Sequence, residues 1–432
     1  MSHYLRVHQQ RDGGWGTHIE SPSTMFGSVL CYVALRLLGA DKDDDACIRG
    51  RKFILKNGGA LYTSSWAKFG LCLLGVMDWR GHNPVPPEFF LLPNWFPFHP
   101  GRMWCHARMV YLPMSVLYGN RVTYERANED PVTISLREEL YVRNYDKIEW
   151  SKTRHWIAPM DNYSPIGTFM RKYFSTFSLS LSLSHTHTHT HTGTAQDLMM
   201  YWESYGGFVK RYVRERGVRF AMDYIHAEDK QTNYVDIGPV NKVYNMLCVY
   251  VFRANRNNRH PEFLRHAGRV RDYLWIAEDG MKMQGYNGSQ TWDTSFAIQA
   301  VVESGLAEKF PNVVRGAWKF LERNQILSTS VSQNTDAYMY EIPERRNQYY
   351  RHVSLGGWPF STSSHGWPIS DCTAEGLKAV LAMRSLKCLD NNTKSKITRK
   401  RLGDAVNVLL TLQNSSGGWA TYVKPFFSLS VL

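Results

Sequence analysis

The sequence predicts an all-α protein. Several segments carry apolar residues at the 3.6-residue period of an amphipathic helix. Alternating runs bounded by hairpin turns, which would predict strands, are scarce. A pattern of Gln, Gly and Trp also recurs at the ends of predicted helices, as in proteins built from repeated units. The predicted helices cover residues 23–39, 66–77, 103–119, 240–251, 292–305 and 372–386.

The first of these helices ends at Gly39, because a glycine directly after the last turn readily adopts the left-handed conformation that stops a helix. The helices that follow keep the same period. In the last one, Leu377, Val380 and Leu381 share one face at i, i+3 and i+4. That helix begins next to Asp371, the acid in the segment HGWPISDCTAEG.

The Gln/Trp repeat has two complete copies and one split copy. We expect the Gln to end a helix, the glycine to turn the chain, and the Trp to fold back onto the Gln amide. Such a unit would tie successive helices together. The copies are Gln9–Gly13–Trp15, Gln413–Gly417–Trp419, and Gln325 with the distant Gly356–Trp358.

Composition excludes several function classes. The chain has 432 residues, of which 43% are hydrophobic and 21% charged, so it can bury a large core. Its 14 Trp, 24 Tyr and 20 Phe suit cations, sugars or flat apolar ligands. The net charge of +13 is dispersed and accompanies no nucleic-acid-binding motif, so we expect no nucleic-acid partner. No apolar run is long enough to span a bilayer, which leaves monotopic attachment open.

Seven cysteines without CxxC pairs indicate a reducing compartment and no zinc site, and no signal peptide is visible. Residues 177–194 are a low-complexity Ser-Leu and His-Thr tract, which we interpret as a disordered insert that originates from intron read-through. The final residues, PFFSLSVL, have the same character. A metal site formed by the histidines of the tract is the alternative. These are His185, His187, His189 and His191.

Asp371 has two readings. An aspartate at a helix start is a preferred N-cap. A carboxyl in apolar surroundings instead has a raised pKa and can act as a general acid, with the neighbouring Cys372 thiol as a hydrogen-bond partner. One acid among aromatic side chains suits a reaction that protonates an apolar substrate once and then stabilises a carbocation. A glycosidase would need a second carboxylate, for which Glu375 is the candidate.

Four segments make the chain similar to the plant oxidosqualene cyclases: GRMWCHARMVYLPMS, IGPVNKVYNMLC, AEDGMKMQGYNGSQTWDT and HGWPISDCTAEGLKA. This resemblance implies the paired α/α barrels of the terpenoid cyclases, of which the chain holds incomplete parts. It also implies cyclisation of 2,3-oxidosqualene without a metal or an organic cofactor, at a monotopic membrane site. The corresponding location is the cytosolic face of the endoplasmic reticulum or a lipid droplet.

The resemblance assigns a role to individual residues. Asp371 is the proton donor to the epoxide, and Cys372 is a hydrogen-bond partner of that acid. His106 and Tyr422 form a polar pair near the later ring cations. The residues expected to contact the substrate or its cations are Trp104, Tyr286, Trp292, Phe360, His365 and Ile369.

Three of these positions point to the product. Tyr286, His106 and Ile369 match the residues associated with cycloartenol synthases, whereas many β-amyrin-type enzymes carry tyrosine at the position of His106. Ala107, Asp236 and Ser364 depart from the usual plant pattern. Parkeol-type and pentacyclic products therefore stay open beside cycloartenol.

The expected domains are a partial N-terminal barrel over residues 1–284 and a partial catalytic barrel over residues 285–432. Family members extend beyond both ends of this chain. The competing hypothesis is therefore an inactive truncated fragment, or a binder of apolar ligands, because an incomplete barrel leaves apolar helix faces exposed. An α/α-barrel glycosidase is the third reading.

Overall fold

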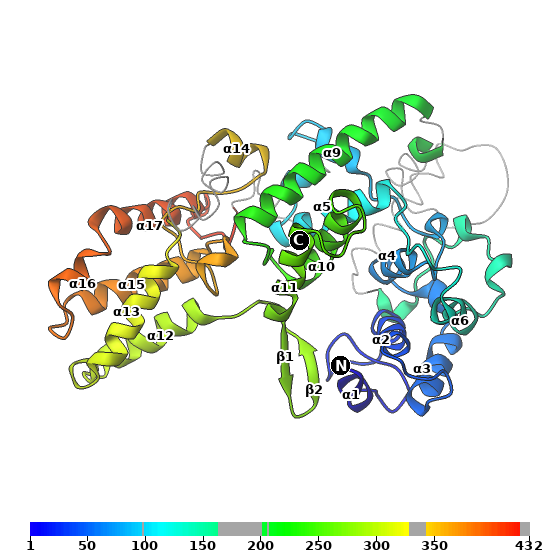
Figure 1. Cartoon of the computed structure of the whole chain (residues 1–432), viewed down its shortest axis with the longest axis horizontal. Helices are drawn as coiled ribbons and strands as arrows, with labels where there is room; N and C mark the ends of the chain where they lie inside the picture. The colour runs from blue at the N-terminus through cyan, green and yellow to red at the C-terminus, as the bar shows by residue number, and fades with distance from the viewer. Residues whose placement is uncertain (97–98, 163–200, 205–206, 328–342, 424–432) are drawn as a thin grey trace. The chain divides into compact units, whose positions relative to one another are not determined.

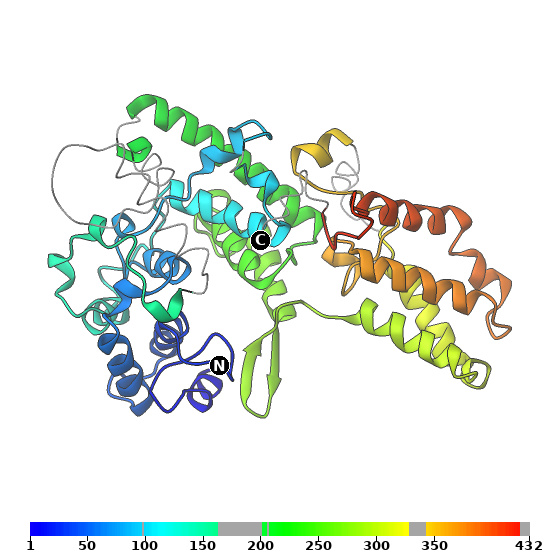
Figure 2. The same cartoon turned by 180° about the vertical axis from the view of Figure 1, so that it is seen from behind.

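A computed structural model describes residues 1–96, 99–162, 201–204, 207–327 and 343–423 (Figures 1 and 2). The predicted insert at residues 177–194 lies outside these ranges. Two compact units divide the described chain. The first contains residues 1–86, 117–215 and 276–282, and the second contains residues 87–116, 216–275 and 283–432. Compact units and family domains are different divisions, so the expected boundary at residue 284 stays a prediction.

The fold is all-α, as predicted. Helices lying wholly in the first unit are α1 (Ser2–Val7), α2 (Met25–Leu37), α3 (Asp45–Lys56), α4 (Ser65–Leu74) and α6 (Pro131–Glu139). Two helices, α5 (Cys105–Gly119) and α9 (Gly207–Gln231), contribute residues to both units. Helices lying wholly in the second are α10 (Pro239–Cys248), α11 (Pro261–Arg269), α12 (Gln290–Glu303), α13 (Pro311–Asn324), α14 (Pro343–Gln348), α15 (Ser370–Arg384), α16 (Asn391–Ser395) and α17 (Arg399–Leu412).

All six helices predicted from periodicity form, with ends displaced by a few residues. Gly39 follows α2 with φ +91°, and its N–H donates to the carbonyl of Arg36, so the predicted stop is confirmed. A single hairpin, β1 (Leu274–Ala277) and β2 (Gly280–Met283), is the sheet of the described residues. A π turn over Val249–Arg253 extends α10, which the sequence did not indicate.

The core of the first unit surrounds α2. Thr24 caps this helix by accepting a hydrogen bond from the Gly27 N–H. Met25, Val29 and Tyr32 are then fully buried on the inward face. Trp15 of the first Gln/Trp copy packs in the same core. Burial of this apolar stripe, rather than helix propensity, therefore stabilises α2.

In the second unit, α15 packs against α12, α13 and α17 (Figures 1 and 2). Thr373 on its first turn donates to the carbonyl of Trp358 and accepts from the N–H of Trp358, at 3.4 and 3.1 Å. The Ile369 N–H donates to the same Trp358 carbonyl. The start of α15 is therefore attached to the split copy of the repeat.

The Gln/Trp repeat is confirmed in all three copies, and each copy makes the same two hydrogen bonds. The Gln Nε2 donates to a glycine carbonyl: Gln9 to Gly13, Gln325 to Gly356, and Gln413 to Gly417, at 2.8, 2.8 and 3.0 Å. The Trp Nε1 donates to the carbonyl four residues before the Gln: Trp15 to Leu5, Trp358 to Leu321, and Trp419 to Leu409. The Trp indole N–H therefore bonds a helix carbonyl, and the expected fold of the Trp onto the Gln amide stays a prediction.

The glycine of the repeat is required by its backbone. Gly356 has φ +92°, and a Cβ there would lie 2.5 Å from the Asp404 carbonyl carbon of α17. Gln325 also donates to the Arg401 carbonyl at 3.0 Å. The split copy therefore joins the end of α13, the turn at Gly356 and the first turn of α17.

Trp358 and Trp419 provide a matched test of the repeat, since both make the same bond. Trp358 is 0% exposed and Trp419 is 52% exposed. We expect Trp358→Ala to lower the free energy of unfolding by about 3–5 kcal/mol, the usual cost of a large buried aromatic. Trp419→Ala should cost less than half as much. Urea unfolding followed by far-UV circular dichroism measures both, and equal losses would contradict the buried role of Trp358.

Candidate active site

Asp371 lies in the first turn of α15, one residue after Ser370 begins the helix. Ile369 occupies the N-cap position, and no side-chain cap is made there. The Asp371 Oδ1 accepts a hydrogen bond from the adjacent Cys372 N–H at 2.7 Å. The alternative that Asp371 is the helix cap is therefore wrong.

The surroundings of Asp371 are apolar on one side only. Ile369 and Cys372 are buried, whereas Asp371 itself is exposed to solvent. The expectation of apolar surroundings therefore holds for these two neighbours, whereas Asp371 itself is exposed. Partial desolvation nevertheless raises the pKa of the Asp371 carboxyl above its ordinary value, and the charge of Glu375 adds to the increase.

Glu375 has the opposite electrostatic behaviour. Burial favours a higher pKa for this carboxyl, but hydrogen bonds from Gln299 and Lys378 outweigh burial and lower the pKa below its usual value. Glu375 is therefore a carboxylate near neutral pH and a poor proton donor. A glycosidase also uses one protonated acid and one ionised carboxylate, so these two pKa directions do not distinguish it from a cyclase.

Cys372 contacts the acid through its backbone. Its side chain is fully buried, and burial raises the pKa of the thiol, with further increases from Asp371 and Glu375. The thiol is therefore uncharged and could only act as a weak hydrogen-bond donor. The bond to Asp371 that the described geometry contains comes from the Cys372 N–H, so the role of the thiol stays a prediction.

Three of the predicted cation-binding aromatics form one cluster. The Phe360 ring lies 4.7 Å from the Tyr286 ring and 5.6 Å from the Trp292 ring, measured between centroids. The first turn of α12 holds this arrangement, because the Trp292 N–H donates to the Phe360 carbonyl at 3.4 Å. Phe296, which sequence reasoning missed, lies one helical turn after Trp292 with its ring at 4.8 Å.

A second cluster contains the predicted polar pair. The His106 ring meets the Tyr422 ring edge-on at 5.0 Å and lies 4.6 Å from Trp104. Burial lowers the pKa of His106, so the imidazole is neutral near pH 7 and can accept a proton. Trp104 is 67% exposed, in contrast to the pocket position expected for it.

Tyr422 of the second cluster also interacts electrostatically with Tyr286 of the first cluster. Its hydroxyl is buried and has no hydrogen-bond partner within the described residues. Burial raises the pKa of this hydroxyl, and Tyr286 and Asp371 raise it further. Tyr422 is therefore protonated at all physiological pH values.

His365 and Ile369 are both buried in the loop before the acid, but their contacts differ. His365 is buried, its Nε2 lies 3.4 Å from the Ile237 carbonyl, and burial lowers its pKa to about 4. This histidine is therefore neutral and attached to the protein interior. Ile369 is buried two residues before Asp371, where its bulk can limit the space above the acid.

Sequence reasoning missed a buried charged group beside this loop. Glu228 on α9 accepts hydrogen bonds from Trp367 and Arg351. Burial raises the pKa of Glu228, whereas the Arg351 guanidinium and the Trp367 N–H favour its ionised carboxylate. Nothing in the periodicity signalled this group, because its members come from three distant segments.

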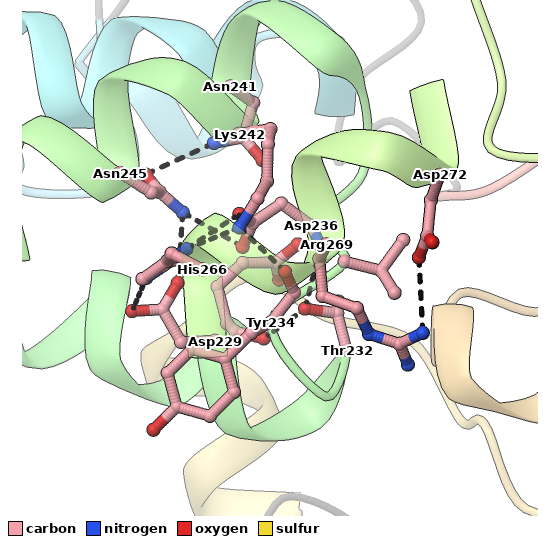
Figure 3. Close-up of polar contacts among 12 residues, drawn as sticks. Asp229, Thr232, Tyr234, Asp236, Asn241, Lys242, Asn245, His266, Arg269 and Asp272 are labelled. Atoms are coloured by element: carbon pink, nitrogen blue, oxygen red, sulfur yellow. Dashed lines mark hydrogen bonds and ion pairs between the residues drawn. The ribbon is translucent and has the colours of Figure 1, made fainter. Parts of the chain in front are cut away.

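A second missed cluster surrounds Asp229 and Asp236 (Figure 3). The His266 Nε2 lies 3.2 Å from Asp229 Oδ2, and the His266 Nδ1 lies 3.6 Å from Asp236 Oδ2. Asn245 donates to both carboxylates at 3.3 and 3.2 Å. Asp236 has φ +66°, so this network holds a turn that a non-glycine residue seldom adopts.

Asp229, Asp236 and His266 carry ligand atoms that fit a metal ion. The Lys242 Nζ, however, lies 2.5 Å from the His266 Nδ1, 3.5 Å from Asp236 Oδ2, and donates to the Tyr234 carbonyl at 2.7 Å. Its ammonium already supplies the positive charge that a metal would bring. The cluster is therefore a charge-paired network of the protein interior.

Comparison with known proteins gives the family. Residues 1–279 match the squalene-hopene cyclase N-terminal domain. The chain belongs to this cyclase family. It is 44% identical over 411 residues to a cycloartenol synthase of Dictyostelium discoideum, covering 95% of this chain and 51% of that protein. It is 41% identical over 426 residues to a lanosterol synthase of Mus musculus, covering 98% of this chain and 52% of that protein.

An alpha-onocerin synthase of Lycopodium clavatum is 36% identical over 423 residues, covering 97% of this chain and 50% of that protein. The chain thus spans about half the length of the curated relatives it matches. The predicted resemblance to the oxidosqualene cyclases is confirmed. The roles assigned to single residues of this cyclase chain stay predictions.

The cluster of Figure 3 gives the cyclase chain a testable pH dependence. Burial raises the pKa of Asp229 from 3.8 to about 7, so the folded state holds its proton where the unfolded state has lost it. This contribution is complete below about pH 4 and is lost as pH rises to about 7. Asp229→Asn removes it. We therefore expect the stability of the wild type to fall, relative to the variant, as pH rises through this window.

Urea denaturation at several pH values between about 4 and 8 measures this difference. His266, Lys242 and Asp236 are the same in both proteins, so their titration largely cancels. Asp404→Asn, which removes a carboxylate paired with Lys400 far from the cluster in the sequence, is the matched control. A stability difference between the wild type and Asp229→Asn that does not change with pH would contradict the expectation.

Proposed function

We propose that this chain carries the acid and the first cation-binding residues of an oxidosqualene cyclase. The observation that supports this most is the position of Asp371. A carboxyl with a raised pKa lies in the first turn of α15 beside buried Cys372. A carboxyl of this kind can hold its proton and deliver it once to a weak base such as an epoxide oxygen.

The proposed reaction is an isomerisation. Asp371 transfers its proton to the epoxide oxygen of 2,3-oxidosqualene, the bond from that oxygen to the tertiary carbon breaks, and a carbocation forms there. Alkene π electrons then form the ring bonds in turn, and the last cation loses a proton to a base. The proton given by Asp371 and the proton lost at the end balance, so no cofactor is consumed.

The aromatic clusters would stabilise the moving charge. Trp292 and Phe360 supply π faces, each worth about 0.5–2 kcal/mol as a cation–π contact. Neutral His106, paired with Tyr422, is a base of suitable strength for the final proton. Tyr286, His106 and Ile369 together favour a tetracyclic alcohol, cycloartenol before parkeol or a pentacyclic product.

We propose monotopic attachment to the cytosolic face of the endoplasmic reticulum or to a lipid droplet, where an apolar substrate accumulates. No helix in the described part of the chain has the length and apolarity needed to cross a membrane. Several large apolar side chains are nevertheless exposed. One-leaflet attachment is compatible with both observations.

A second candidate function follows from exposure. Asp371 is open to solvent, and water around the acid would intercept a newly formed cation. The chain by itself would then bind apolar ligands without cyclising them. Cyclisation by the chain alone, and by a hybrid with the other half of a relative, separates the two candidates.

The acid role is tested in a hybrid in which this chain replaces the matching half of the Dictyostelium discoideum cycloartenol synthase. Asp371→Asn keeps the side-chain shape but removes the transferable proton, so we expect cyclisation to fall by at least about 1,000-fold. Asp404→Asn, which breaks a surface ion pair with Lys400, should retain activity. Product formation is measured by gas chromatography with mass spectrometry. Substantial cyclisation by Asp371→Asn would move the acid role to another residue.

The product is a separate prediction for the same hybrid. We expect a tetracyclic triterpene alcohol as the main product, with cycloartenol first. His106→Tyr should shift the mixture toward other products, because a tyrosine is a far weaker base than a neutral imidazole. A mainly pentacyclic product from the unchanged hybrid would show that Tyr286, His106 and Ile369 do not determine the outcome.

A further inference from the structure

Two buried contacts join helix α9 to the loop that precedes Asp371. The Trp367 Nε1 donates to Glu228 Oε1 at 2.8 Å, and the Arg351 Nη1 donates to Glu228 Oε2 at 2.7 Å. The Arg351 Nη2 also donates to the Gly366 carbonyl at 3.0 Å. All three side chains are buried, so these charge-assisted hydrogen bonds are not weakened by solvent.

The Trp367 ring is fixed on more than one side. The Arg351 guanidinium lies over it at 4.0 Å from the ring centroid, which is a cation–π contact. The Tyr422 ring meets it edge-on at 6.2 Å. Trp367 therefore stands between the buried carboxylate and the pair formed by Tyr422 and His106.

The backbone of the loop lies in close contact with the backbone of α9 at Gly366. A Cβ on Gly366, which has φ +64°, would lie 2.1 Å from the Gln231 carbonyl oxygen. Gln231 is the last residue of α9, and Glu228 lies one turn before it. The loop and the end of this helix are thus packed backbone to backbone, with Glu228 holding the next residue, Trp367, in place.

We propose that Glu228 is a positioning residue for the acid, and that it acts through Trp367 and Arg351 on the loop His365–Ile369. This inference deepens the proposed function and rests on it for the role of Asp371. Glu228 touches neither Asp371 nor the aromatic clusters in the described structure. Its effect is to fix the residue four positions before the acid, so that α15 begins at one place and in one direction.

The two donors that face Glu228 explain why a charged residue is buried beside this loop. A buried carboxylate costs several kcal/mol in lost hydration, and an apolar residue would avoid that cost. An apolar residue, however, would leave the Trp367 N–H without an acceptor and the Arg351 guanidinium without its opposite charge. The carboxylate accepts a hydrogen bond from each donor with a different oxygen. This pairing favours one loop conformation over other conformations that are equally compact.

The test uses the full chain and the thiol of Cys372, which is buried directly beside the acid. Iodoacetamide modification, quantified by peptide mass spectrometry, reports opening of this loop without requiring catalysis. We expect Glu228→Gln to speed modification of Cys372 by at least about tenfold. The loss of one charge-assisted hydrogen bond raises the population of the locally open loop by a factor of this order. Cys248, buried in the same unit, and Cys72, buried in the other, should react at their original rates.

Matched variants make the test selective. Asp223→Asn removes an exposed charge from the same helix and should leave Cys372 protected. Trp367→Phe keeps an aromatic ring but removes the N–H that Glu228 accepts, so it should expose Cys372 as Glu228→Gln does. The two changes combined should add little beyond either one, because they break the same contact.

Unchanged modification of Cys372 in Glu228→Gln would overturn the proposal. Equal acceleration at Cys248 and Cys72 would also overturn it, since Glu228 would then support the whole unit rather than the loop. Failure of the proposed function is a different result. In that case a hybrid enzyme would make no triterpene alcohol, although Cys372 of the unchanged chain stays protected and becomes reactive in the variant.

Discussion

The position of the acid depends on how a helix end satisfies its last carbonyls. At the end of α13, the Leu321 carbonyl accepts two hydrogen bonds, from the Gln325 N–H at 3.2 Å and from the Trp358 indole N–H at 2.9 Å. The indole bond fixes the Trp358 backbone, which in turn binds Ile369 and Thr373. A hydrogen bond made for helix termination therefore determines where α15 begins, and with it where Asp371 lies.

Two different kinds of interaction hold the loop before Asp371, one on each side. On one side, the Trp358 segment offers backbone hydrogen bonds and a tight contact, since a Cβ on Gly357 would lie 2.5 Å from Pro368. On the other side, α9 offers the buried carboxylate of Glu228. Backbone bonds fix the register of the loop, whereas the charged group selects one side-chain arrangement at the cost of desolvation. Both are needed where an acid must meet one oxygen atom of a flexible substrate.

Periodicity and short motifs predicted the parts of this protein that local sequence controls. The helices, the stop at Gly39 and the three Gln/Trp copies follow from spacing alone, because their interactions join residues close in sequence or of one recurrent type. The partner of the Trp indole was not predicted, although the same carbonyl serves in every copy. The motif identifies the Gln and Trp side chains that donate hydrogen bonds. It does not identify the carbonyl that accepts from the Trp, because a backbone atom carries no sequence signal.

The interactions of Glu228 and Asp236 were beyond prediction for a related reason. Glu228 lies 139 positions from Trp367 in the sequence, and each residue alone looks like an ordinary helix or loop residue. Asp236 was noted only as a departure from the plant pattern, and its pairing with Lys242 and His266 depends on packing of α9, α10 and α11. Single-sequence reasoning identifies side chains that can carry charge, but tertiary packing decides which of them are buried together.

The exposure of Asp371 bears on how such an acid would be activated. Desolvation is already the largest cause of its raised pKa, although one side of the carboxyl faces water. An apolar substrate that covered this side would remove the remaining water and raise the pKa further. Glu375 would stay ionised, because its partners Gln299 and Lys378 are made by the protein and not by solvent. Under the proposed function, substrate binding itself therefore favours the protonated form of the acid, and the bound substrate completes the apolar surroundings expected from the sequence.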